Sequence, residues 1–393
     1  MTSTSIRHPF LLAPWAVLLV RIALVLIVLG ELYVTATVQR PDLLHSTAIG
    51  TDSSNYYAAG QRLNAGHDLY GPLRITDRRV PGYPGAYPAP LLSPPLVAVI
   101  WRPLAALGDT SMTTWWAANL ALVVGLAVWF AAVGRRWTLG GLLAILALGW
   151  PIALVLSAPY RYLGYQSPIS IAALSGNLNG YLTGLCILVW WASSRGNSWL
   201  AGSAAGLAAM LKLGPFALAW WLVVRRDWPA VKAFVVTVVV LGIVGLLGAG
   251  LDANLAFARL ALGAGVTPSS LSVPWMLHTW LGLDPHVADL GTIVATIVGL
   301  AVVSATRRRA RISFLVTILV VIYCSPVVLV GNFALLLAAV APWVVPDRSG
   351  SLAGHGPASV RATAAPRRGA IADEPSIDAL DRGTGVQACQ WSA

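Results

Sequence analysis

Charge is what this sequence has least of. Only 10% of its 393 residues are charged, whereas 57% are hydrophobic. A soluble globular protein carries about 25% charged residues. A chain so poor in charge cannot cover a water-facing surface, and lipid is the solvent that suits it. The composition predicts an all-α integral membrane protein, a polytopic bundle of about ten transmembrane helices.

Cysteine and the common catalytic signatures are also scarce. The three cysteines, Cys186, Cys324 and Cys389, have no spacing typical of a zinc site or a disulfide framework. The chain contains no evident nucleophilic triad, phosphate-cradling glycine loop or zinc-binding sequence. The sequence therefore does not indicate a hydrolase with a nucleophilic triad, a protein with a phosphate-binding glycine loop or a zinc enzyme.

The net charge of +11 comes almost entirely from arginine, because lysine occurs only at Lys212 and Lys232. The basic residues form short clusters between apolar runs, as at Arg135-Arg136, Arg225-Arg226 and 307–311. Such clusters are typical of cytoplasmic loops between transmembrane helices. We therefore interpret the charge as a topology signal and predict no nucleic-acid partner.

Apolar runs long enough to cross a bilayer set the predicted organisation. The candidate spans are 11–36, 112–133, 139–157, 169–192, 230–249, 289–306, 312–329 and 331–346. With the N-terminus in the cytoplasm, 91–107 is interpreted as a re-entrant or juxtamembrane element, and 198–224 as a hairpin that enters and leaves on one side. This scheme places Arg195 and the arginine clusters inside.

The same scheme predicts one transmembrane domain over residues 1–346. It has a long first outer loop at 37–90 and a second outer loop at 250–288. Residues 347–393, rich in Gly, Ala, Pro, Arg and Ser, are predicted to form a disordered cytoplasmic tail.

The first outer loop has the clearest pattern of polar residues. Residues 53–64 have helical character, end before Gly66, and follow Asp52 at a position typical of an N-cap. The chain has 15 carboxylates, of which five lie in the tail. Most of the others, Asp52 among them, fall on the predicted outer face.

Several motifs in this order resemble glycosyltransferase family 87, a member of the GT-C superfamily. The first loop reads Asp52, Tyr56, an Ala-rich helix, Gly66, Asp68-Leu-Tyr70 and then Tyr87-Pro-Ala-Pro. Downstream, 175–180 (Ser-Gly-Asn-Leu-Asn-Gly), 201–215 with Lys212, 225–228 and 325–326 also resemble the family. Asn177 stands where the family usually has Gln. The resemblance covers about residues 20–345.

The resemblance implies an enzyme that uses a polyprenyl-phosphate sugar as donor and a glycolipid or polysaccharide as acceptor. It places the catalytic base at Asp52, which would take the proton of the attacking hydroxyl. The alternative is that Asp52 merely caps a helix. Mannose is the first choice of sugar, by resemblance alone, and arabinofuranose is the alternative.

The leaving lipid phosphate needs a cation at the membrane boundary. Lys212, in the middle of an apolar hairpin, is the best candidate, since a lysine in lipid is expensive. Its alternative role is to snorkel to an interface. Arg62 is a second cation candidate. Asn177 and Asn179 are predicted to bind sugar hydroxyls near the outer end of a helix, or else to join transmembrane helices.

Four further residues complete the predicted substrate site: Tyr56, Asp68, Tyr70 and His278. The tyrosines are suited to stacking on sugar rings, and His278 to contact with phosphate or acceptor, unless it is incidental. No carboxylates are paired as Asp-x-Asp or Asp-Asp, so we predict no metal and no other cofactor. A lipid or glycan transporter or flippase and a non-catalytic scaffold remain alternatives of other classes.

Overall fold

A computed structural model of the chain describes residues 51–71, 91–108, 110–111, 114–115, 117–119, 121–122, 125–126, 168, 172, 175–263, 271–323, 325 and 328–344. All of them belong to a compact unit, residues 1–350, and residues 351–393 form a second unit. The predicted spans 11–36 and 139–157 and the tail 347–393 lie outside the described residues.

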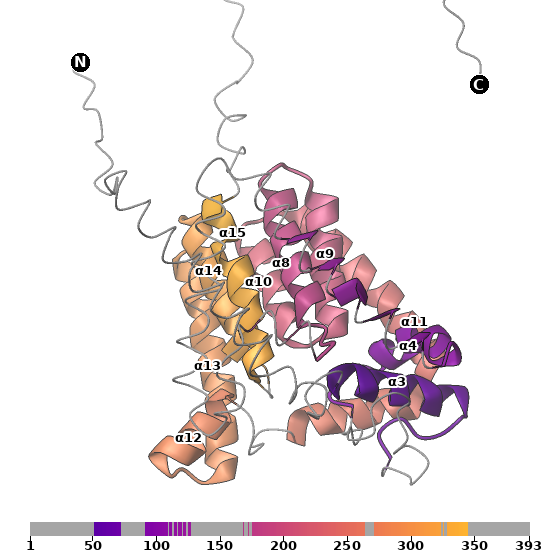
Figure 1. Cartoon of the computed structure of the whole chain (residues 1–393). Coiled ribbons are helices and arrows are strands. Elements are labelled where there is room, and N and C mark those ends of the chain that lie inside the picture. Colours follow the sequence, from indigo (N-terminus) through magenta and orange to yellow (C-terminus); the bar gives the residue numbers. More distant parts are fainter. Residues whose placement is uncertain are drawn as a thin grey trace, which may run out of the picture. The chain divides into compact units, whose positions relative to one another are not determined.

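The described part of the chain is helical and contains no strand, as the composition predicted (Figure 1). Its elements are α3 (Thr51–Asn64), α4 (Pro95–Ala106), α8 (Asn179–Ser193), α9 (Ser198–Leu211), η4 (Gly214–Phe216), α10 (Ala217–Val224), α11 (Trp228–Gly263), α12 (Val273–Leu281), α13 (Pro285–Ala305), α14 (Ala310–Tyr323), η5 (Val330–Leu335) and α15 (Leu336–Val344).

Two helices are long and apolar enough to cross a membrane by length and composition. These are residues Trp228–Ala261 of α11 and Pro285–Ala305 of α13. In each, only 11% of the most apolar window is buried inside the protein. Side chains such as Leu247 and Ile297 are 81% and 62% exposed. Apolar surface of this extent needs an apolar partner. The polytopic bundle itself stays a prediction.

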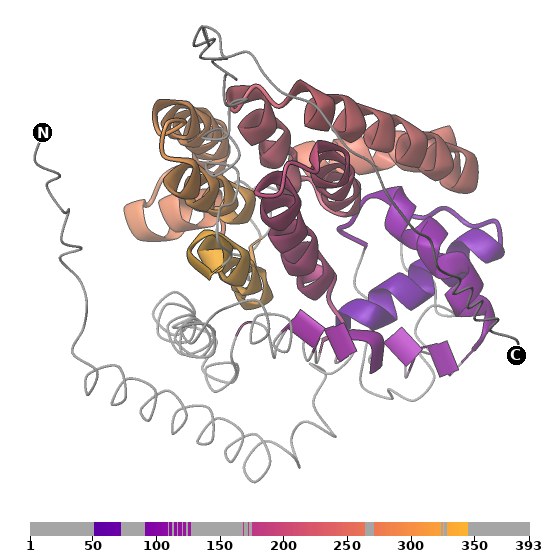
Figure 2. The same ribbon diagram turned by 90° about the horizontal axis from the view of Figure 1, so that it is seen from above.

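The helix α3 packs against α4, and α4 against α11 (Figures 1 and 2). Gly60 permits the first contact, because a Cβ there would lie 2.7 Å from the Trp101 carbonyl oxygen. Arg102 joins all three helices, since Nε donates to Asn64 of α3 and Nη1 to the Gly248 carbonyl of α11. These contacts fix the helix that carries Asp52.

The segment 91–107 does not form a full-length span. Its helix α4 begins with Pro95 in the first turn and ends before Gly108, whose φ is +64°. Twelve residues rise only about 18 Å, against a hydrocarbon core of about 30 Å. The proline-broken stretch thus forms a short helix packed on α3 and α11.

Residues 198–224 fold back on themselves. The helix α9 breaks at Lys212, whose backbone is extended at φ −157° and ψ 143°, and the chain returns through η4 and α10. Gly202, early in α9, lies directly against Ala230, early in α11. The helix α10 ends at Val224, only six residues before Ala230. The end of α10 therefore lies near the start of α9, and the chain enters and leaves the hairpin on the same side.

The second predicted outer loop is more helical than its sequence indicated. The helix α11 continues beyond Gly250, where a φ of +84° introduces a kink, as far as Gly263. The helix α12 follows at 273–281 and ends at Gly282 in the left-handed region. The span predicted at 169–192 also needs correction. Its α8 begins at Asn179, and residues 175–178 form a turn that places Asn177 outside the helix.

Candidate active site

The first turn of α3 is fixed to the turn that precedes α8. The backbone N–H groups of Asp52 and Ser53 both donate to the Ser175 carbonyl, at 3.1 and 3.2 Å. The side-chain amide Nδ2 of Asn177 donates to Oδ2 of Asp52 at 2.7 Å. Since α3 begins at Thr51, Asp52 lies inside the helix. Its carboxylate faces Asn177, which argues against a role as mere helix cap.

Glycine at position 176 allows this close approach. Its φ is +69°, a region that residues with a Cβ rarely adopt, and a Cβ there would lie 2.7 Å from Cβ and Oγ of Ser53. The indole Nε1 of Trp115 donates to the Gly176 carbonyl at 2.7 Å. The turn at 175–178 is thus held by α3 on one side and by Trp115 on the other, and these contacts also fix the position of Asp52.

Burial raises the pKa of Asp52 above its ordinary value of 3.8. Hydrogen bonds from Asn177 and Ser175 and the positive charge of Lys212 act in the opposite direction, because each stabilises the ionised carboxylate. A carboxylate whose pKa is raised is a stronger proton acceptor than an exposed one. The environment of Asp52 therefore suits a general base.

A second polar cluster surrounds Lys212. Its Nζ donates to Oδ1 of Asn179 at 3.2 Å and to Oδ1 of Asn332 at 3.1 Å. Nδ2 of Asn179 also donates to Oδ1 of Asn332 at 2.8 Å. Both asparagines are buried. In the part of the chain that the structure describes, the ammonium group of Lys212 is held by neutral amides and forms no ion pair.

The two clusters are joined through Asn177. Its Oδ1 accepts a hydrogen bond from the backbone N–H of Asn179 at 2.8 Å, while its Nδ2 binds Asp52. Lys212 and Asp52 also interact electrostatically. The structure thus brings four predicted site residues into one connected arrangement, with a carboxylate at one side and an ammonium group at the other.

Among the other predicted residues of the first loop, Arg62 and Tyr70 form hydrogen bonds to backbone carbonyl groups. Nη1 of Arg62 donates to the carbonyls of Leu69 and Gly71, both at 3.1 Å, and closes the loop after α3. The Tyr70 hydroxyl donates to the Ser93 carbonyl at 2.6 Å. Tyr56 is buried beside Trp101 and interacts electrostatically with Asp52. Asp68 is exposed.

His278 belongs to a different neighbourhood. It lies in the last turn of α12, and its Nδ1 is 2.7 Å from the Leu283 carbonyl oxygen. No contact among the described residues joins it to Asp52 or Lys212. Its predicted role in binding phosphate or acceptor stays a prediction.

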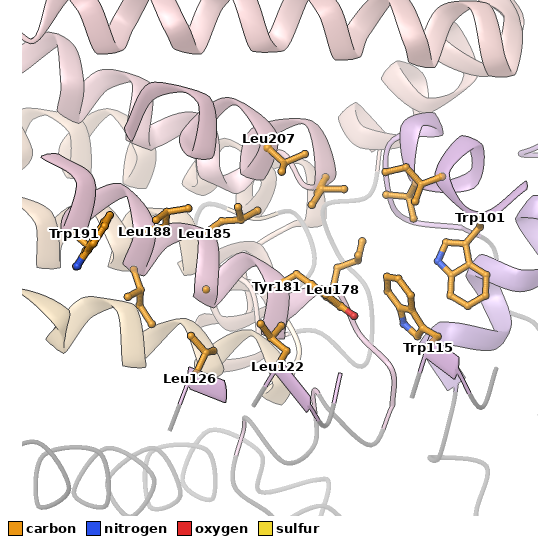
Figure 3. Close-up of a pocket in the computed structure, with 15 residues that line it drawn as sticks. Trp101, Trp115, Leu122, Leu126, Leu178, Tyr181, Leu185, Leu188, Trp191 and Leu207 are labelled. Carbon is orange, nitrogen blue, oxygen red and sulfur yellow. The ribbon is translucent and has the colours of Figure 1, made fainter. Parts of the chain in front are cut away.

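An apolar groove of about 590 Å³ begins at the joined clusters. Leu178, between the two asparagines, lines its near end with Trp101 and Trp115. From there the groove follows α8 to Trp191 (Figure 3). Its remaining walls are almost wholly aliphatic: Val97, Ile100, Leu122, Leu126, Tyr181, Gly184, Leu185, Ile187, Leu188, Leu207 and Leu211.

Asn332 was not among the site residues predicted from the sequence. This residue is only 3% exposed and completes the cluster around Lys212. The signal was present, because Asn332 is an amide within the apolar run 328–341, and polar residues in such runs commonly join helices or mark sites. Ser175, whose carbonyl anchors α3, carries no comparable signal.

Comparison with protein families identifies the chain as an enzyme that transfers sugars, a glycosyltransferase. The chain belongs to glycosyltransferase family 87, whose family model matches residues 92–330, more than half of the chain. This confirms the resemblance drawn from the motifs. The match includes Asn177, Asn179 and Lys212, and it begins after Asp52. No curated protein and no solved structure matches the chain.

Proposed function

We propose that this glycosyltransferase is a multi-pass membrane enzyme that moves a sugar, mannose, from polyprenyl phosphate to a hydroxyl of a glycolipid or cell-wall glycan, with inversion at the anomeric carbon. The observation that carries the proposal is the joined arrangement of Asp52, Asn177 and Lys212 at the near end of an apolar groove. It offers a base, a cation and a lipid-binding surface in one place.

The reaction needs one proton acceptor and one bond exchange. The acceptor oxygen attacks the anomeric carbon and forms the new C–O bond, while the bond from that carbon to the phosphate oxygen breaks. The phosphate keeps the electron pair, and the hydroxyl proton passes to the Asp52 carboxylate. A positioned base of this kind contributes about 10²–10⁴-fold to the rate. Asn177 orients the carboxylate through its 2.7 Å hydrogen bond.

Lys212 is suited to the phosphate that leaves. Its ammonium group is oriented by the Oδ1 atoms of Asn179 and Asn332. Because amides orient the ammonium without cancelling its charge, that charge remains to stabilise the negative charge that develops on the phosphate. In this mechanism Lys212 supplies the cation, and no metal ion is required.

The apolar groove along α8 fits the polyprenyl chain of the donor. Its lining contains no charged residue, and its volume of about 590 Å³ is in the range of lipid and ligand sites. Because Leu178 lines the groove between Asn177 and Asn179, a chain lying there would present its phosphate to Lys212.

The order of the helices supports an outward-facing site. Lys212 lies where α9 ends, Asn179 where α8 begins and Asn332 beyond the end of α14. Arg195 and the arginine clusters occupy the opposite helix ends: Arg195 after α8, Arg225 and Arg226 after α10, and 307–311 between α13 and α14. Because arginine-rich ends face the cytoplasm, the site lies at the outer face.

The decisive experiment measures sugar transfer by the purified protein in liposomes that contain EDTA. Polyprenyl-phosphate mannose is the donor and a glycolipid the acceptor. We expect transfer by the wild type and a loss of about 10²–10⁴-fold in Asp52→Asn. Asp252→Asn removes an exposed carboxylate of α11 and is the matched control. Equal rates for wild type and Asp52→Asn would exclude Asp52 as the base.

Two further experiments distinguish the alternative sugar and the alternative function as a flippase. Polyprenyl-phosphate arabinofuranose replaces the donor in the first, and transfer from it alone would change the assigned sugar. The second follows movement of the labelled lipid donor across the bilayer without acceptor. Movement in the absence of any transfer would favour a flippase. Activity that disappears with EDTA and returns with a divalent cation would refute the metal-independent mechanism.

A further inference from the structure

A second groove lies on the other side of the Lys212 break. It has a volume of about 460 Å³ and is lined mainly by η4, α10 and α13, with Ala261 of α11 and Val320 of α14. Leu213 and Gly214 line it, whereas Leu211 lines the groove along α8. Lys212 therefore stands between the residues that line the two grooves. We call the second one the α10–α13 groove.

This groove is lined by a carboxylate, that of Asp289, whereas no charged residue lines the groove along α8. Oδ1 of Asp289 and Oγ1 of Thr292 are buried and have no hydrogen-bond partner among the described residues. Both side chains line the groove, on successive turns of α13. A carboxylate at the wall of a largely apolar groove is costly unless hydrogen-bond donors reach it, so a ligand with hydroxyl groups is favoured there.

Apart from Thr296, the rest of the groove is apolar, and it reaches the exposed apolar face of α13. Leu290 and Ile293 line it and are 58% and 57% exposed. Trp220 of α10 crosses to α13 and donates to the Leu300 carbonyl and to Ser304. From Asp289 to Leu300 the groove follows α13 for about 16 Å. Its ligand must therefore combine hydroxyl groups with an apolar chain.

We propose that the α10–α13 groove binds the acceptor, and that this acceptor is a glycolipid. This inference rests on the proposed function, because a transferase must hold two substrates at one reacting centre. The head-group hydroxyls donate to Asp289 and Thr292, and the alkyl chain lies along α13. The donor chain occupies the groove along α8, so the two lipids meet on either side of Lys212.

The test uses an octyl α-mannoside that carries a diazirine in its alkyl chain, with the full-length protein in nanodiscs. Photolabelling followed by peptide mass spectrometry locates the bound chain. We expect labels on α10 and α13 that unlabelled octyl mannoside competes away. Asp289→Leu should lose this labelling and Thr292→Val should reduce it. Asp252→Asn, which removes an exposed carboxylate outside the groove, should label as the wild type does.

Kinetics with polyprenyl-phosphate mannose provide the second readout. We expect the KM for octyl mannoside to rise about tenfold or more in Asp289→Leu. The slow transfer to water, which needs no acceptor lipid, should stay within about twofold. Thr292→Val, which conserves the shape of the side chain, decides the matter if Asp289→Leu fails to fold.

Labelling confined to the groove along α8, or unchanged labelling in both variants, would overturn the proposal. So would a water-soluble mannan oligosaccharide that serves as acceptor equally well in wild type and Asp289→Leu. Failure of the proposed function looks different, because the wild type would then cleave no donor even into water. The photolabelling result still decides whether the groove binds a glycolipid.

Discussion

The carboxylate of Asp52 and the amide of Asn177 form a 2.7 Å hydrogen bond across 125 positions of sequence. The backbone N–H of Asn179 donates to Oδ1 of Asn177, and the side-chain Oδ1 of Asn179 accepts a hydrogen bond from Lys212. The Asp52 carboxylate and the Lys212 ammonium group are therefore linked by hydrogen bonds through one short turn.

The pH dependence of transfer should report the ionisation of Asp52. A base acts only when deprotonated, so kcat/KM should fall as the pH drops through its pKa, which is raised above 3.8. The hydrogen bond from Asn177 favours the charged form and lowers that pKa. Asn177→Leu should therefore move the acidic limb to higher pH.

Asn254→Leu is the control for this shift, because Asn254 is bonded only locally, to the Gly250 carbonyl, in the described contacts. Its acidic limb should coincide with that of the wild type. An Asn177→Leu enzyme with lower activity but an unmoved limb would show that Asn177 does not tune the base.

The positive charge of Lys212 should govern affinity for the phosphate. Asn332→Asp places a carboxylate where an amide oxygen now lies 3.1 Å from Nζ. An ion pair would then form, and an incoming phosphate would meet less positive charge. We expect inhibition by the product, polyprenyl phosphate, to weaken about tenfold or more, as it should in Lys212→Met.

Asn254→Asp introduces the same charge at an exposed position of α11 and should leave product inhibition unchanged. The inhibition constant is measured at fixed pH and ionic strength. If Asn332→Asp binds polyprenyl phosphate as tightly as the wild type, Lys212 does not bind the leaving group.

Gly176 should tolerate no side chain. In Gly176→Ala the left-handed backbone costs about 1–2 kcal/mol, and the overlap with Ser53 adds about 1–3 kcal/mol. Because Ser53 follows Asp52, activity should fall together with the thermal unfolding temperature. Gly196→Ala has a similar φ of +75° but no atom within 4 Å of the new Cβ. Equal losses in the two variants would contradict a steric role.

Filling the groove along α8 should affect long-chain donors selectively. A Cβ at Gly184 would only touch Leu122 and Leu126 at 3.8 Å, so Gly184→Leu occupies groove space without disturbing the helix backbone. We expect the KM for a long polyprenyl-phosphate donor to rise about tenfold, with little change for a donor of one or two isoprene units. Equal effects on both donors would place the chain elsewhere.

Local signals in the sequence predicted much of the fold. The apolar runs at 230–249, 289–306 and 312–329 correspond to α11, α13 and α14. Lys212 beside Gly214 and Pro215 marked the break after α9. The kink at Gly250 and the helices within 250–288 were missed, because a short polar interruption carries no periodic signal that distinguishes a kinked helix from a loop.

By itself, the sequence determined the helical class and the family. It also singled out Asp52 and Lys212, because charged residues are scarce and these two fall in a predicted outer loop and in an apolar hairpin. Only the tertiary structure decided that Asn177 faces Asp52 and that Asn332 completes the Lys212 cluster. The reason is physical. Contacts between residues more than a hundred positions apart arise from helix packing and from the turn at Gly176, and local periodicity encodes neither.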